Sequence, residues 1–168
     1  MGQQFPDRSL PELITLADCD GDWAKYLEAI YAIFRRDFVE SMPTYPGKRF
    51  AMKRHPMALG KEATFWHLIQ EGPVEDDRLP DFRRCERIRW PRPMIEALQS
   101  GHVRVWKNIR GRSERIIISV SDFSYVVVLD DREEFVLLWT AYYVDQHHQR
   151  RKFAKEFAAW QNAQSQNS

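Results

Sequence analysis

The chain of 168 residues has only two cysteines, Cys19 and Cys85, and no long apolar run. Two thiols are too few for a disulfide framework or for a thiolate metal site. No apolar stretch approaches the roughly 18 residues that a membrane-spanning helix needs. The first residues also lack the basic and apolar regions of a secretory signal peptide. These absences predict a cytoplasmic protein with no membrane partner.

The motifs of several enzyme classes are missing as well. The sequence has no glycine-rich phosphate loop, no Gly-x-Ser-x-Gly elbow, and no Asp followed by Glu-x-Lys that would build a two-metal nuclease centre. Its two Asp-Asp pairs lie in turn-like segments, where aspartate is favoured for backbone reasons. The adjacent His147 and His148 would point to different sides of a helix, which makes a poor metal site. We therefore predict no metal and no other cofactor.

The chain does have a concentration of arginine. Residues 81–115 hold nine Arg and one Lys against four acids, a local charge of +6 in a chain whose net charge is +1. The guanidinium group suits bidentate recognition of phosphate and stacking on bases. Two tryptophans lie among these cations. The segment predicts a surface for a polyanion, with nucleic acid as the first candidate.

The residues that we predict to hold nucleic acid are Arg83, Arg84, Arg87, Arg89, Trp90, Arg92 and Trp106. In one alternative they bind nucleic acid without catalysis, and the tryptophans stack on bases. In another, the arginines face an acidic protein partner, as in an immunity or interaction module. In a third, they pair with the chain's own 24 acids and form an ordinary solvated surface.

The first hundred residues predict helices. Apolar side chains recur at spacings of three and four between residues 22 and 41, and Asp20 or Asp22 is placed to cap that helix. A shorter helix is expected at residues 10–17, after an N-terminal signature that begins at Ser9. The proline-rich interval 41–57 predicts a loop. Prolines divide the arginine-rich stretch into two short helical turns, at residues 83–88 and 93–99.

After Gly101 the period of the pattern changes to two. Four segments rich in β-branched and aromatic residues predict strands at residues 102–110, 114–121, 124–130 and 134–144. Their connections are short, which predicts an antiparallel meander. Residues 145–160 return to a helical period. The fold class is therefore α+β, with N-terminal helices, a four-stranded antiparallel meander and a C-terminal helix. We expect a single domain over 1–168, with a helical part at 9–99 and the sheet and last helix at 102–161.

Three side chains of the predicted sheet suit a phosphate site. Lys107 shares one face of its strand with β-branched residues, where a charge is costly unless it is paired. It is either a functional ammonium or an edge-strand lysine that discourages pairing. Thr140 and Tyr142 have the same parity, so their hydroxyl groups project side by side from one face. They hold a phosphate, or they fill a surface on which Thr and Tyr are common.

His67 is the histidine most suggestive of catalysis. It lies in an aromatic and apolar run, so its imidazole is expected to be partly buried and oriented. A histidine in such a run is either a satisfied core group or a general base that works near neutral pH.

The order of helices and strands resembles the barnase–EndoU–colicin–RelE-like nuclease superfamily, and in particular its phage and prophage members. The residues that carry the resemblance are 65–68, 125–129 and 137–143, which include the motif Thr140-Ala141-Tyr142. The resemblance covers roughly residues 60–160. It implies a metal-independent ribonuclease or toxin whose His, Lys, Arg, Thr and Tyr residues surround one sheet face.

Carried onto this chain, the resemblance implies that His67 is the base or acid and that Lys107 and Arg110 lie near the scissile phosphate. Thr140 and Tyr142 would orient that phosphate. The hypothesis is a small ribonuclease of prophage or toxin type, which cleaves RNA by attack of the 2′-hydroxyl. Its expected partners are RNA, either tRNA or mRNA, and an antitoxin or immunity protein.

Overall fold

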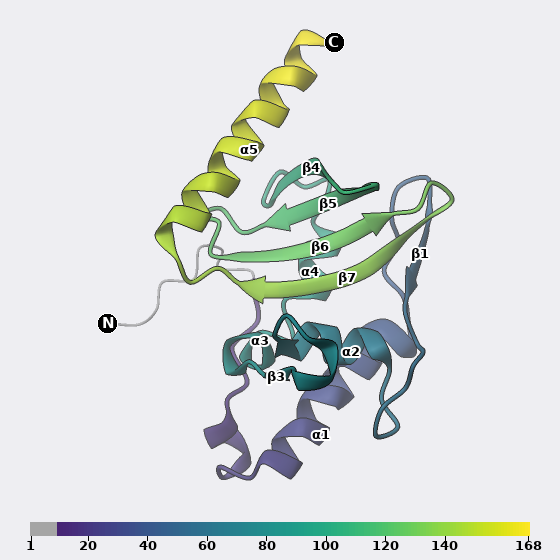
Figure 1. Ribbon diagram of the computed structural model, residues 1–168, viewed down its shortest axis with the longest axis vertical. Helices are drawn as coiled ribbons and strands as arrows, with labels where there is room; N and C mark the ends of the chain where they lie inside the picture. Colours follow the sequence, from purple (N-terminus) through teal and green to yellow (C-terminus); the bar gives the residue numbers. More distant parts are fainter. Residues whose placement is uncertain (1–9) are drawn as a thin grey trace.

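The computed structural model describes residues 10–168, except for the side chain of Arg110. The protein is α+β, with helices packed against a mixed five-stranded sheet (Figure 1). The strands of this sheet are β1 (Arg49–Met52), β4 (Arg104–Arg110), β5 (Ser113–Ser119), β6 (Tyr125–Asp131) and β7 (Phe135–Tyr143). The α-helices are α1 (Trp23–Phe34), α2 (Ala63–Ile69), α3 (Phe82–Glu86), α4 (Pro91–Glu96) and α5 (His147–Gln166). The shorter elements are η1 (Leu16–Cys19), η2 (Arg35–Val39), η3 (Glu75–Asp77), β2 (Gln70–Glu71) and β3 (Leu79–Pro80).

The strand order β1-β7-β6-β5-β4 corrects the prediction of a four-stranded antiparallel meander. Strands β4 to β7 pair antiparallel in chain order, but β1 adds a fifth strand that runs parallel to β7. This strand falls inside the interval 41–57, which was expected to be a loop. Phe50 and Met52 of β1 are buried and alternate with more exposed neighbours. Four residues between prolines are too short a run for the period-two pattern to show in the sequence.

The helix expected between residues 22 and 41 is confirmed. Asp22 caps α1, since its side chain accepts a hydrogen bond from the backbone N–H of Lys25 at 3.2 Å. The buried face of α1 includes Tyr26, Ile30 and Phe34, at spacings of four, and the π-helical η2 continues it. The helix expected at residues 10–17 is wrong. Within the described residues, this part of the chain holds only the short 3-10 turn η1.

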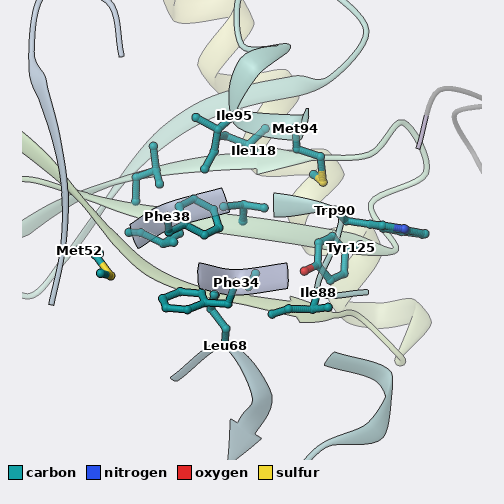
Figure 2. Packing of buried hydrophobic residues seen from close by; sticks show 14 of the residues in the cluster. Phe34, Phe38, Met52, Leu68, Ile88, Trp90, Met94, Ile95, Ile118 and Tyr125 are labelled. Carbon is teal, nitrogen blue, oxygen red and sulfur yellow. The ribbon is translucent and has the colours of Figure 1, made fainter. Parts of the chain in front are cut away.

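The main core fills the space between the N-terminal helices and one face of the sheet (Figure 2). Phe34 and Phe38 come from α1 and η2, Leu68 comes from α2, and Ile118 and Tyr125 come from the sheet. Strand β6 is buried along most of its length, because its alternate residues face this core and a second cluster on the other side. The two short helical turns expected in the arginine-rich stretch are confirmed as α3 and α4, which belong to this helical layer.

The second cluster lies on the opposite face of the sheet, where α5 packs mainly on β4. Trp106 of β4 is fully buried there against Phe153 and Phe157 of α5. The remainder of α5 extends beyond the sheet (Figure 1). The β7 side of the same face carries an open pocket, so this face is only partly covered. No helix within residues 10–168 has both the length and the apolar character required to cross a membrane.

Candidate functional site

The site is centred on His67, which lies in the last turn of α2. Thr64, Phe65, Leu68 and Ile69 of this helix are buried, while the His67 side chain is 20% exposed. His67 is one of the residues that line an open pocket of about 510 Å³. The expectation that this imidazole is partly buried is confirmed.

The His67 ring has a charged group near each nitrogen. The guanidinium Nη1 of Arg78 lies 3.4 Å from Nδ1, and the carboxylate Oε1 of Glu75 lies 3.9 Å from Nε2. The indole ring of Trp139 lies 5.8 Å from the imidazole ring, centroid to centroid. An arginine can only donate, so its contact with Nδ1 favours the neutral tautomer that carries its proton on Nε2. Lys53 also lines the pocket.

The pKa of His67 is lowered below its ordinary value of 6.5. Burial is the largest cause, because it penalises the charged imidazolium. The positive charge of Arg78 lowers the pKa further, whereas Glu75 opposes the shift and Lys53 adds a smaller lowering. At neutral pH the ring is therefore neutral and able to accept a proton, which is the state that a general base requires.

This electrostatic arrangement predicts a titration below pH 6.5 for His67, measurable from its ring proton shifts by NMR. Replacing Arg78 with glutamine removes a nearby positive charge, so the pKa of His67 is expected to rise. The exposed Arg54 offers a matched control, and Arg54→Gln is expected to leave the titration unchanged. A pKa above 6.5 in the parent protein, or a fall in Arg78→Gln, contradicts this account.

Arg84 of α3 joins α2 to β7. Its Nη1 donates to the carbonyl oxygens of His67 at 3.2 Å and Gln70 at 2.8 Å, and it contacts Oγ1 of Thr140 at 3.4 Å. Its guanidinium also lies over the ring of Tyr142, 5.4 Å from the centroid. The hydroxyl of Thr140 donates to the same His67 carbonyl at 3.1 Å. These contacts fix the turn that carries His67 against the sheet.

Thr140 contacts the backbone of His67, and Tyr142 contacts the Arg84 guanidinium that binds the same carbonyl. The Thr140 hydroxyl donates its hydrogen bond to the backbone carbonyl of His67 and is not directed to a ligand. Both residues line a smaller open pocket of about 180 Å³ on the second face of the sheet. Arg115 and Trp139 line it too, with the guanidinium over the indole ring at 4.4 Å.

Lys107 lies elsewhere. Its cross-strand partner is Ile116, which belongs to the core beneath the helices, so Lys107 is on the helical face of the sheet. Its ammonium pairs with Glu114 at 3.6 Å and Asp131 at 3.9 Å. The charge is therefore satisfied by ion pairs with residues near the start of β5 and at the end of β6. Arg110 ends β4, and its side chain lies outside the described part of the structure.

The resemblance implied that Lys107 and Thr140 lie beside the same phosphate, but the structure places them apart. Strands β5 and β6 lie between β4 and β7, which is three inter-strand steps or about 14 Å. Thr140 pairs with Val128, a member of the second cluster, so the two side chains also belong to opposite faces. The parity of a strand shows which residues share a face but does not show which face is open.

The two tryptophans expected to stack on bases are buried. Trp90 is 2% exposed, and its indole N–H donates to the carbonyl oxygen of Pro11 at 2.8 Å. Trp106 is fully buried, and its N–H donates to the carboxylate of Glu156 at 3.1 Å. Neither ring presents a face to a ligand, which corrects that prediction. Both act as core residues whose polar atom finds an internal partner.

The arginines of the same segment are also held by internal partners. Arg87 is buried, and its guanidinium lies over the rings of Tyr143 and Trp90. Burial lowers the pKa of Arg87. Arg84 lies 3.4 Å from a carboxylate oxygen of Asp81. These two side chains brace the protein and do not form an open phosphate surface.

Arg83, Arg89 and Arg92 are more accessible but also have partners. Arg83 pairs with Asp145, and Arg89 donates to the carbonyl oxygen of Glu12 at 3.3 Å. Arg92 pairs with Glu96 at 2.6 Å. The ion pairs of this segment correspond to the alternative in which the arginines neutralise the chain's own acids.

Sequence reasoning missed four residues near His67, namely Lys53, Glu75, Arg78 and Trp139. Lys53 follows β1, which was expected to be a loop, and the other two charged residues lie in a polar connection with no periodic pattern. Trp139 could have been found from its place in the same strand as Thr140.

No protein-family model, curated protein or solved structure matches the chain. Within residues 10–168 no group of three or more His, Cys, Asp or Glu side chains is arranged to hold a metal ion.

Proposed function

We propose that this protein is a metal-independent ribonuclease in which His67 is the general base. The observation that supports this most is the half-buried imidazole of His67, whose pKa is lowered by burial, in the lining of an open pocket with Arg78 and Lys53 beside it. A base and cations in one pocket are what cleavage by a neighbouring 2′-hydroxyl requires. The resemblance to the barnase–EndoU–colicin–RelE-like superfamily, which includes phage and toxin nucleases, agrees with this proposal.

In the proposed reaction, Nδ1 of His67 takes the proton of an RNA 2′-hydroxyl. The 2′-oxygen then attacks the adjacent phosphorus, the bond from phosphorus to the 5′-oxygen breaks, and that oxygen takes a proton from water. The hydroxide left behind takes the proton from His67, which restores the neutral imidazole. The products are a 2′,3′-cyclic phosphate and a free 5′-hydroxyl. Arg78, whose Nη1 now faces Nδ1 at 3.4 Å, turns its N–H groups to the phosphate oxygens and, with Lys53, stabilises the added negative charge.

The remaining site residues have supporting roles in this proposal. Arg84 and Thr140 are positioning residues, because both bind the backbone carbonyl of His67 and neither needs to touch the substrate. The pocket lined by Arg115, Trp139 and Tyr142 offers a partly apolar surface beside the histidine. It is the natural place for a nucleotide that flanks the cleaved bond, since bases stack on aromatic rings and guanidinium groups.

The test is incubation of the purified protein with single-stranded RNA in excess EDTA. We expect cleavage that leaves 2′,3′-cyclic phosphate ends, identified by mass spectrometry. A DNA of the same sequence lacks the 2′-hydroxyl and is expected to stay intact. Intact RNA in the presence of folded protein contradicts the proposal. Salt-sensitive RNA binding without any product would instead identify a non-catalytic nucleic-acid-binding protein.

A further inference from the structure

Helix α5 carries a stripe of basic residues that is not part of the site around His67. Its members are His148, Arg151, Lys152 and Lys155, which follow the spacing i, i+3, i+4, i+7. Residues at this spacing lie on one face of a helix. All four side chains are exposed. Across residues 10–168, no ion pair closer than 4.0 Å involves Arg151, Lys152 or Lys155, so the charge of the stripe is not neutralised.

The opposite side of α5 is anchored to the sheet. Phe153 is buried against Trp106, and Phe157 packs on the same indole ring. The carboxylate of Glu156 accepts hydrogen bonds from the Trp106 indole at 3.1 Å and from the Asn108 amide at 3.2 Å. At about 100° per residue, Phe153 and Phe157 lie roughly opposite the basic stripe. The helix is therefore held in place with its cations directed to solvent.

The distribution of charge on α5 distinguishes this stripe from an ordinary solvated face. The helix has four Arg and Lys residues but a single acid, Glu156. The carboxylate of Glu156 accepts a hydrogen bond from the sheet. The cations of α5 therefore lack the acidic partners that stabilise an ordinary charged helix through i,i+4 ion pairs. A rigid array of unneutralised cations, from Arg151 to Lys155, that spans about 6 Å along a helix suits the spaced charges of a phosphate backbone.

We propose that the basic stripe of α5 is a second nucleic-acid contact, which binds the phosphate backbone of RNA at a distance from the His67 pocket. This inference rests on the proposed function for the identity of the polyanion as RNA. An anionic membrane is a poorer match. A helix that lies in a membrane surface inserts its apolar face into the lipid, whereas Phe153 and Phe157 of α5 are packed on the sheet. The stripe faces away from the sheet, so it holds long RNA and has no contact with a dinucleotide in the pocket.

The experiment compares two triple variants of the full chain. The stripe variant is Arg151→Gln, Lys152→Gln and Lys155→Gln. The control variant removes equal charge from exposed positions on α1, η2 and β1, by Lys25→Gln, Arg35→Gln and Arg49→Gln. Binding of a fluorescein-labelled single-stranded RNA is followed by anisotropy from about 50 to about 200 mM salt. Cleavage of a dinucleotide is measured in parallel.

We expect the stripe variant to bind the long RNA at least about tenfold more weakly at low salt than the control variant. The slope of log K against log salt should fall by about 2, at roughly 0.7 for each of three lost phosphate contacts. Dinucleotide cleavage should be unchanged in both variants. Equal binding by the two variants overturns the proposal, as does loss of binding to phosphatidylserine vesicles in the stripe variant while its RNA binding is kept. If the parent protein binds RNA through the stripe but cleaves nothing, the stripe is supported and the ribonuclease proposal fails.

Discussion

Replacing His67 with glutamine is expected to lower the rate of dinucleotide cleavage in EDTA by a factor of about 10² to 10⁴, the usual contribution of a general base. Glutamine keeps a polar side chain of similar reach between Arg78 and Trp139, but it cannot accept a proton at neutral pH. The rate constant is measured under single-turnover conditions, so that chemistry and product release are separated.

The control for this variant is His102→Gln, which removes an imidazole from an exposed position outside the described pocket. It should cleave at the parental rate. Urea unfolding of both variants shows that they are folded. A His67→Gln variant that retains full activity means that His67 is not the base. RNA affinity is expected to change little, because glutamine retains the uncharged state that burial imposes on the imidazole.

Replacing Trp106 with alanine is expected to lower the free energy of unfolding by about 3–5 kcal/mol, the usual cost of removing a large aromatic side chain from a core. The ring is fully buried between β4 and α5 and contacts both Phe153 and Phe157. Its loss also removes one of the hydrogen bonds to Glu156. The free energy is obtained from urea unfolding followed by circular dichroism.

Trp160, which is only partly buried further along α5, provides a matched tryptophan. Trp160→Ala should destabilise the protein much less than Trp106→Ala, because less of its surface is removed from water. The conservative Trp106→Phe should keep RNA binding at the parental level. If Trp106→Phe loses RNA binding while its unfolding free energy is unchanged, the ring contacts nucleic acid and its assignment as a core residue is wrong.

The elements that the sequence predicted correctly are those whose pattern is long and local. The helix that contains α1 and the helix α5 have a helical period, and each of the strands β4 to β7 is a segment of at least seven residues rich in β-branched and aromatic side chains. Strand β1 was missed because its four residues form a strand only by pairing with β7, which follows more than eighty residues later in the chain. The helix expected at residues 10–17 has suitable end signals but does not form, and Ser9 lies outside the described residues.

The candidate site was also predicted only in part, because local patterns indicate some of its residues and long-range packing decides the others. An aromatic run indicated a half-buried His67, and the parity of one strand placed Thr140 and Tyr142 side by side. The roles of Lys107 and Trp106 depended on which sheet face the helices cover, and a single strand does not encode that. The arginines of residues 83–92 were expected to face a ligand, but several close over aromatic rings and carbonyl oxygens of the protein itself.

The sequence by itself determined where the longer helices and strands of this protein form, because backbone preference and side-chain periodicity act between near neighbours. It also determined that His67 is partly buried and that α5 is basic. Only the tertiary structure decided which charges are neutralised and which stay free. Arg84 meets Thr140 across 56 positions of the chain, and Trp106 meets Glu156 across 50. Such contacts arise from the packing of distant elements, so no local pattern distinguishes an arginine bound by internal partners from one that is free to bind a ligand.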